Sequence, residues 1–508
     1  MVADSPRECR QESCQGTRLA FFAAVAAAVT VSLVAISGRS LWIDEACTAV
    51  RAMQPTLGSW WQAMAQAKTG CLQMPFYMLY TWGWTKLFGL SEWSFHLANL
   101  PWFVAGAAAL ILSFPAGGRG RPIAAVLVLF CPFAWYYLDE ARPYAMQLGA
   151  TLLIVASLRR LAQEGCGADS KEAVQVALFL VGMIVLCGSS LFGMIWAAPV
   201  VGVLLALLPR TRLVSLLKRH CWLWLAAAGP LFGFAIYYVW TLTMGARGSA
   251  AATTTLGSIL FDGYELLGFG GLGPGRLEMR NTGVAALHGY WLPVALYGVA
   301  TAILLGAAVW SGLKQWNRRH LAIVLCCCVP AVVILGTGWL VNFRALGRHL
   351  APSVPLLLLL FMLGASTLWS RRSVWARLAV IFFCGLSLIS CLSLRFSARH
   401  QKDDYRAAAA LARTALRDGQ QVWWNAAEEG AQYYGVPVTT GAAASGVALF
   451  VVNPSRDSLT SLPAPGLIIA SKMDVYDIQM ALAEYVRDRG YSPIRKFAAF
   501  VVWARKSN

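Results

Sequence analysis

The stretch Ser40-Leu41-Trp42-Ile43-Asp44-Glu45-Ala46-Cys47-Thr48 places two adjacent carboxylates directly after the first long apolar run, 19–36. A second acidic pair, Asp139-Glu140, directly follows another apolar run, 122–138. A carboxylate at the centre of a membrane span costs roughly 2.5–3.5 kcal/mol, and less toward the span ends. Two acidic pairs at the ends of apolar runs therefore indicate a functional site at a membrane surface.

The composition requires many membrane spans. Of 508 residues, 58% are hydrophobic and only 13% are charged, and the mean hydropathy is +0.57. A soluble domain carries about 25% charged residues. The net charge of +18 does not indicate nucleic-acid binding, because Lys and Arg accumulate in the cytoplasmic loops of membrane proteins.

Eleven apolar runs have spanning length. They are 19–36, 95–114, 122–138, 144–158, 174–188, 191–208, 221–240, 291–310, 321–341, 350–369 and 378–394. Three arginines precede the first run, which lacks a convincing cleavage site after it. We interpret it as an uncleaved first span. The predicted fold is an α-helical polytopic membrane protein with about eleven transmembrane helices.

The apolar segment 74–89 contains Pro75 and Lys86, so it either spans or lies in the interface as an amphipathic helix. If it does not span, the basic clusters at 119–121, 159–171, 210–219, 314–319 and 371–377 share one side with the N-terminus. The positive-inside rule favours this arrangement. It places the N-terminus in the cytoplasm and both acidic pairs at the outer face.

Two domains are predicted. Residues 1–395 form the transmembrane domain, with interfacial helices in a first outer loop, 38–94. Residues 396–508 form a small extracytoplasmic α/β domain, with a helix capped by Asp403-Asp404 and running to about 417. Strands are expected at 421–424, 447–452, 467–470 and 496–504, and an amphipathic helix at 474–489.

The acidic pairs offer the chemistry of a transferase. An outward carboxylate from Asp44-Glu45 is able to act as general base on an acceptor hydroxyl. Asp139-Glu140 then orients the acceptor, tunes the first pair by like-charge proximity or holds a cation. The alternative for each pair alone is a solvated helix end.

Cationic and aromatic side chains at the predicted outer face complete the candidate site. Arg344 and Arg348 have the planar fork suited to a phosphate, although lipid-headgroup anchoring is the alternative. Lys68, in the first outer loop, is a further phosphate candidate. Arg142 pairs locally with the second acidic pair or contacts substrate. Tyr144 stacks on a sugar or lipid, or belongs to an interfacial aromatic belt.

The sequence leaves open whether the protein binds a metal and whether it forms a disulfide. No His or Cys cluster has zinc-site spacing, and no glycine-rich phosphate loop is followed by Lys and Ser/Thr. A divalent metal held by Asp44 and Asp139 remains an alternative, and no other cofactor is indicated. Cys47 and Cys71 fall in the same outer loop, where an oxidising compartment would permit a disulfide.

The first stretch, with its Trp-Ile-Asp-Glu-Ala core, resembles the first-loop motif of the GT-C membrane glycosyltransferases. The similarity is to the bacterial branch related to protein O-mannosyltransferases and the lipid A aminoarabinose transferase. Further stretches match that branch in order: Met74-Pro75-Phe76-Tyr77, Leu87-Phe88-Gly89-Leu90-Ser91-Glu92, Asp139-Glu140-Ala141-Arg142-Pro143-Tyr144, Arg348-His349-Leu350-Ala351-Pro352 and Lys402-Asp403-Asp404-Tyr405-Arg406. The resemblance covers nearly the whole chain.

The resemblance implies an inverting sugar transfer from a polyprenyl-phosphate donor to a lipid, glycan or protein acceptor outside the inner or plasma membrane. Asp44 would be the catalytic base beside Glu45, Asp139 and Glu140 the second-loop acids, and Arg348, with Arg344, the phosphate contact. The sequence departs from the branch at Gln73-Met74-Pro75, at Ser189-Ser190-Leu191-Phe192 and at His349. A transporter or flippase of lipid-linked glycans is the alternative, although its usual internal repeats are not visible.

Overall fold

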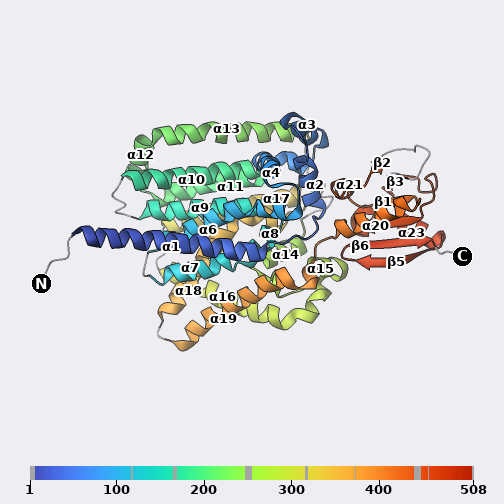
Figure 1. Ribbon diagram of the computed structural model, residues 1–508. Helices are drawn as coiled ribbons and strands as arrows, with labels where there is room; N and C mark the ends of the chain where they lie inside the picture. The colour runs from blue at the N-terminus through green and yellow to red at the C-terminus, as the bar shows by residue number, and fades with distance from the viewer. Residues whose placement is uncertain are drawn as a thin grey trace.

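The computed structural model describes residues 6–115, 118–163, 169–245, 254–314, 318–341, 343–371, 373–439, 448–455 and 457–505. Long helices lie roughly side by side in a bundle, and a smaller α/β domain sits at one end of it (Figure 1). The first described helix begins at the opposite end. We call the end that carries the α/β domain the domain-side end.

The bundle confirms the predicted membrane class. Among the described residues, nine helices are long and apolar enough to cross a membrane, or eleven if each of two bent pairs forms one span. The long spans use α1 (Pro6–Ala35), α6 (Leu100–Ser113), α9 (Tyr144–Ala162), α10 (Asp169–Ser189), α13 (Cys221–Thr243), α16 (Trp291–Lys314), α17 (Arg318–Leu340), α18 (Val354–Ser370) and α19 (Val374–Phe396). The bent pairs are α7 (Gly120–Leu129) with α8 (Pro132–Leu138), and α11 (Leu191–Leu207) with α12 (Arg210–Arg219).

Small residues let the central helices approach closely. A Cβ added at Gly106 on α6 would lie 2.3 Å from the carbonyl oxygen of Gly149 on α9. The two helix backbones are therefore in direct contact, as small residues permit between membrane helices. This contact fixes α9, whose first turn follows the second acidic pair.

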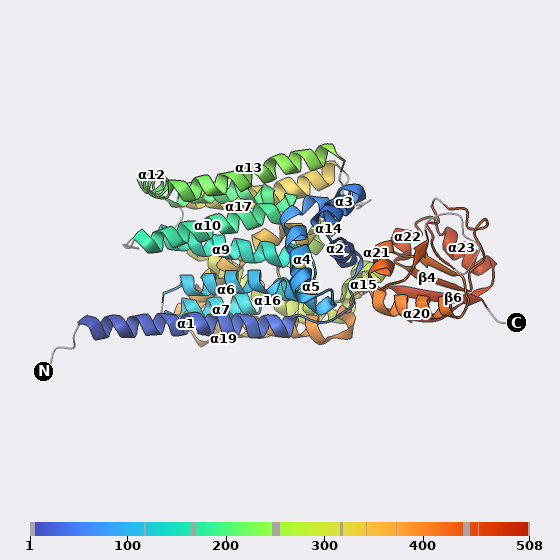
Figure 2. The ribbon, with the colours of Figure 1, turned by 45° about the horizontal axis from the view of Figure 1, so that its top comes forward.

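Short helices fill the domain-side end. They are α2 (Ile43–Ala52), α3 (Leu57–Ala67), η1 (Gly70–Gln73), α4 (Pro75–Phe88), α5 (Glu92–Leu97), α14 (Leu256–Leu266), η2 (Phe269–Gly271), α15 (Arg276–Thr282), η3 (Gly283–Tyr290) and η4 (Gly347–Ser353). The ambiguous segment 74–89 becomes α4, a helix of 14 residues that is not among the candidate spans, whereas α6 continues the span that begins with α5 at Glu92. In Figure 2, α4 runs across the bundle rather than along it.

The C-terminal domain contains a six-stranded sheet in the order β2-β3-β1-β4-β6-β5. Its strands are β1 (Val422–Asn425), β2 (Val438–Thr439), β3 (Leu449–Val451), β4 (Leu467–Ser471), β5 (Tyr491–Phe497) and β6 (Phe500–Arg505). Strands β1–β4 pair in parallel, and β6 joins β4 and β5 antiparallel. The domain helices are η5 (Ala398–His400), α20 (Tyr405–Arg417), α21 (Glu428–Tyr433), α22 (Met473–Tyr476) and α23 (Ala481–Asp488).

The sheet is covered on both faces, which explains its buried strands. Trp424 packs with α20 and α21 on one face, and Trp423 packs with α23 on the other. The predicted α/β class and the Asp404 cap of α20 are confirmed, since the Asp404 side chain accepts a hydrogen bond from the backbone N–H of Ala407.

Two predicted elements of this domain are wrong. The helix expected at 474–489 is two helices, because the Asp477 side chain accepts hydrogen bonds from the backbone N–H groups of Leu482 and Ala483 and so starts α23. The single strand expected at 496–504 is part of the β5–β6 hairpin, whose turn puts Ala498 at φ 40°. Val447, in the strand expected at 447–452, lies outside the described residues.

Candidate active site

The four acidic side chains do converge at the domain-side end, but they do not share one environment. Asp44 and Glu45 lie in the first turn of α2, where the helix dipole favours negative charge. Glu45 also accepts a hydrogen bond from the backbone N–H of Trp42 at 3.1 Å, which caps the N-terminus of α2. The two neighbours therefore point in different directions and meet different partners.

Asp44 is the accessible acid of this group. Its Oδ2 lies 2.8 Å from Nη1 of Arg348, and the two side chains are 27% and 17% exposed. The Arg348 guanidinium also lies over the rings of Trp42 and Tyr144, at 5.7 and 5.8 Å. Burial alone would raise the pKa of Asp44, but the cations Arg348, Arg142 and Lys472 outweigh it and hold this pKa below its ordinary value. Asp44 is thus a carboxylate beside a cation at the edge of the cluster.

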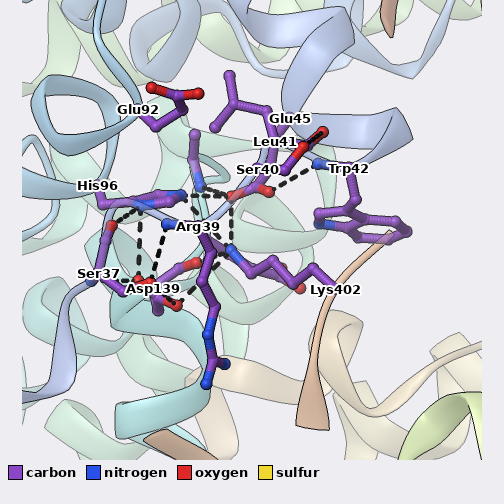
Figure 3. Close-up of polar contacts among 12 residues, drawn as sticks. Ser37, Arg39, Ser40, Leu41, Trp42, Glu45, Glu92, His96, Asp139 and Lys402 are labelled. Atoms are coloured by element: carbon purple, nitrogen blue, oxygen red, sulfur yellow. Dashed lines mark hydrogen bonds and ion pairs between the residues drawn. The ribbon is translucent and has the colours of Figure 1, made fainter. Parts of the chain in front are cut away.

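Glu45 is fully buried and saturated with partners (Figure 3). Its Oε1 contacts Nε2 of His96 at 2.9 Å, Nζ of Lys402 at 3.0 Å and the backbone N–H of Ala141 at 2.7 Å. Burial raises the pKa of Glu45, yet Lys402, His96 and the Ala141 N–H lower it to about 2. This carboxylate holds the cluster together and has little capacity left to accept a proton near neutral pH.

Asp139 belongs to the same buried cluster. Its carboxylate accepts hydrogen bonds from the Ser37 backbone N–H at 2.6 Å and from the Ser37 hydroxyl at 2.8 Å. Nζ of Lys402 also bonds to the Asp139 carbonyl oxygen. The ring nitrogens of His96 lie 2.6 Å from the Ser37 carbonyl oxygen and 2.9 Å from the Glu45 carboxylate. Lys402 thus contacts both Glu45 and Asp139.

Glu140 occupies a third environment. Its carboxylate is fully buried, and neither oxygen has a hydrogen-bond partner among the described residues. Nη1 of Arg276 lies 3.8 Å away. Burial raises the pKa of Glu140 to about 7, although the Arg276 and Lys402 cations oppose the shift. Arg276 itself pairs with Glu265 at 2.5 Å and donates to the Tyr137 hydroxyl at 2.9 Å.

Of the predicted substrate-binding residues, Arg142 and Tyr144 contact α2 or Arg348, whereas Lys68 and Arg344 do not. Arg142 donates at 3.3 Å to the Asp44 carbonyl and to the Thr48 hydroxyl, so it ties the second acidic motif to α2 instead of pairing with its own carboxylates. Tyr144 lies under Arg348. Lys68 and Arg344 are exposed, and no hydrogen bond or ion pair of theirs is found in the described part of the chain.

The side chain of His349 contacts the backbone of its own loop. Its Nδ1 accepts a hydrogen bond from the Leu346 N–H at 3.1 Å, and its ring stacks on Phe192 with centroids 4.4 Å apart. Phe192 and His349 are two of the positions at which this sequence departs from the GT-C branch that it resembles. Their direct contact shows that the two departures form one structural unit.

Three residues of the cluster were not predicted as site residues: His96, Arg276 and Lys402. Lys402 was quoted only as part of the motif that begins the C-terminal domain. No sequence pattern links it to Glu45, which lies 357 positions away. Arg276 is a single arginine outside every motif quoted above, so the sequence did not indicate that it belongs to the site either. His96 lies in the apolar run 95–114. A single polar residue in such a run indicates a functional role, and this was the signal by which His96 could have been found.

The structure shows where the candidate metal ligands and the two candidate disulfide cysteines lie. Over the described ranges, no group of three or more His, Cys, Asp and Glu side chains is arranged to hold a metal ion. Asp44 and Asp139 have separate partners, Arg348 and Ser37. The Cys47 and Cys71 sulfurs lie 3.1 Å apart as free thiols. The hydrogen bond from Cys47 lowers the pKa of Cys71 against its burial, and Arg142 adds to the effect.

Comparison with solved structures identifies the architecture. ArnT from Cupriavidus metallidurans in the apo state aligns over 97% of this chain and 98% of its own, with a TM-score of 0.52 and 14% identity. The chain has an ArnT-like fold. The structure of that ArnT bound to undecaprenyl phosphate aligns over 95% of this chain and 97% of its own, with a TM-score of 0.50 and 14% identity.

The arabinofuranosyltransferase AftD from Mycobacteria aligns over 97% of this chain but 42% of its own, with a TM-score of 0.47 and 14% identity. No family model and no curated protein matches the sequence. The ArnT-like fold confirms the predicted fold class and agrees with the resemblance seen in the sequence. At 14% identity the likeness concerns the fold, so the roles of residues rest on the geometry above.

Proposed function

We propose that this chain is a glycosyltransferase that moves a sugar from a polyprenyl-phosphate donor to an acceptor hydroxyl, with inversion at the anomeric carbon. The pairing of Asp44 with Arg348 carries the proposal. It puts a general base and a phosphate-binding cation side by side at the one accessible carboxylate of the four. The ArnT-like fold supports it, since that ArnT was solved with undecaprenyl phosphate.

The reaction needs few groups. The acceptor oxygen attacks the anomeric carbon from the face opposite the phosphate, and the bond from that carbon to the phosphate oxygen breaks. Asp44 takes the acceptor proton. The carrier phosphate leaves with the bond electrons and stays on Arg348. Because the leaving group is already a phosphate, no strong general acid is required. The buried Glu45 and Asp139 position α2 and the second acidic loop.

The site would face the outside of a cell membrane. The distribution of Lys and Arg supports a cytoplasmic N-terminus and an outward domain-side end, in the inner or plasma membrane. Polyprenyl-phosphate sugars delivered to that face would be the donors. Lipid, glycan or protein would serve as acceptor.

Asp44→Asn tests the proposal. The asparagine cannot take the acceptor proton, so transfer from a polyprenyl-phosphate sugar should be abolished in purified protein while expression and thermal stability stay unchanged. Asp474→Asn, on α22 of the C-terminal domain in an exposed ion pair with Arg280 of α15, is the matched control and should leave transfer intact. Wild-type activity in Asp44→Asn would remove Asp44 as the base.

A further inference from the structure

The Arg348 guanidinium has few polar partners for a group that is to hold a phosphate. Over the described part of the chain, its one hydrogen bond and ion pair join Nη1 to the Asp44 carboxylate at 2.8 Å. Its Nε is buried and has no acceptor among the described residues. Once the carrier phosphate displaces Asp44, none of these hydrogen bonds is left to keep the side chain in place.

Two aromatic rings contact the guanidinium instead. Its central carbon lies 5.7 Å from the centroid of the Trp42 ring and 5.8 Å from that of the Tyr144 ring. A guanidinium within about 6 Å of an aromatic face is attracted by the negative charge density of the ring. Neither ring contact uses a hydrogen-bond donor of Arg348, so both remain when a phosphate replaces Asp44.

Both rings are fixed by the elements that carry them. Trp42 is the N-cap residue of α2, and its backbone N–H donates to the Glu45 side chain. Tyr144 is the first residue of α9, and its ring meets that of Tyr137 with centroids 5.1 Å apart. Two packed helices thus orient a side chain that belongs to a third element, η4.

The C-terminal domain brings a second cation to the Trp42 ring. Nζ of Lys472, which follows β4, lies 5.1 Å from the ring centroid, and Lys472 also pairs with Asp403. Nε1 of Trp42 is buried without a hydrogen-bond partner in the described residues, although a buried indole N–H usually has one. Contacts with two cations, rather than a hydrogen bond of Nε1, therefore set the place of this ring.

We infer that Trp42 and Tyr144 are positioning residues of the phosphate site, which hold the Arg348 guanidinium where the carrier phosphate meets it. The inference rests on the proposed function and adds the residues that keep its cation in place after Asp44 is released. Lys472 links this arrangement to the C-terminal domain. Neither ring needs to touch the sugar or the lipid chain for this role.

A double-mutant cycle on the affinity for undecaprenyl phosphate tests the inference. The full-length protein in detergent is titrated with undecaprenyl phosphate at fixed salt. Trp42→Leu should weaken binding roughly 5- to 30-fold, because a desolvated cation–π contact is lost. Trp42→Phe keeps a ring and should stay within about threefold of wild type. In an Arg348→Ala background, Trp42→Leu should change the affinity by less than about twofold, since no guanidinium is left to position.

The controls separate this inference from the proposed function. Trp375→Leu, at an 80% exposed ring in the first turn of α19, should bind normally. Wild-type affinity in Trp42→Leu, or an equal loss with and without Arg348, would overturn the inference and leave the proposed function standing. Wild-type affinity in Arg348→Ala would remove the phosphate role on which both rest. Tyr144→Leu should show the same dependence on Arg348, and its cycle decides the question if Trp42→Leu does not fold.

Discussion

Replacing Arg348 with alanine should separate carrier binding from the rest of the reaction. In the structure Arg348 pairs with Asp44 at 2.8 Å and is 17% exposed. Truncating one partner of a buried charge pair costs about 2–5 kcal/mol in binding. The carrier phosphate must first displace Asp44 from the arginine, which offsets part of its gain. We therefore expect the lower half of that range, about 2–3.5 kcal/mol, which is a roughly 30- to 370-fold weaker affinity for undecaprenyl phosphate.

The same substitution should move the pH profile. Arg348 is the first cation that lowers the pKa of Asp44 against its burial. Without it this pKa rises, so the base becomes protonated at a higher pH. Activity as a function of pH falls on the acid side as Asp44 gains its proton. The acid limb of kcat/KM should consequently shift to higher pH in Arg348→Ala.

Binding of undecaprenyl phosphate is best measured on the purified protein by titration, at fixed salt, together with residual transfer from pH 5 to 9. Arg417→Ala is the matched control, because that arginine is exposed on α20 of the C-terminal domain and donates hydrogen bonds within its own helix. Arg348→Lys keeps the charge but loses the fork and should fall between the two. Affinity within twofold of wild type in Arg348→Ala would refute the phosphate role.

Three further predictions concern the buried groups. Lys402→Met should destabilise the protein by about 3–5 kcal/mol, because it leaves two buried carboxylates short of a cation; thermal unfolding should show the loss, and Lys402→Arg should show less. Treating the protein with a mild dithiol oxidant should join Cys47 and Cys71, with the loss of two hydrogens by intact mass and about 3 kcal/mol of stabilisation; unchanged mass after oxidation would contradict the contact, and Cys71→Ser is the control. Glu140→Gln should gain stability over wild type as pH rises from about 4.5 to 7, by up to about 3 kcal/mol, because the raised pKa of Glu140 makes wild type lose stability across that range. A stability difference that stays constant between pH 5 and 8 would count against this burial.

The sequence predicted what depends on local pattern. Apolar runs predicted the spans, and acidic pairs at their ends predicted that Asp44 and Asp139 would lie at the same end of the bundle. It did not predict the partners, because Lys402 reaches Glu45 across 357 positions and Arg276 reaches Tyr137 across 139. The hairpin turn at Ala498 has φ 40° without the Gly or Asn that usually marks such a turn, so no local signal separated β5 from β6.

The four acids differ because the chain gives each a different access to water and to cations. Glu45 and Asp139 share Lys402, which comes from the segment that leads into the C-terminal domain. That domain also contributes Lys472, which lies over Trp42 at 5.1 Å and pairs with Asp403. Docking of the domain thus neutralises the buried pair and leaves Asp44 as the carboxylate at the surface of the cluster. A domain that only covered the bundle would need no buried lysine. The position of Lys402 therefore indicates that the C-terminal domain is a structural part of the candidate active site.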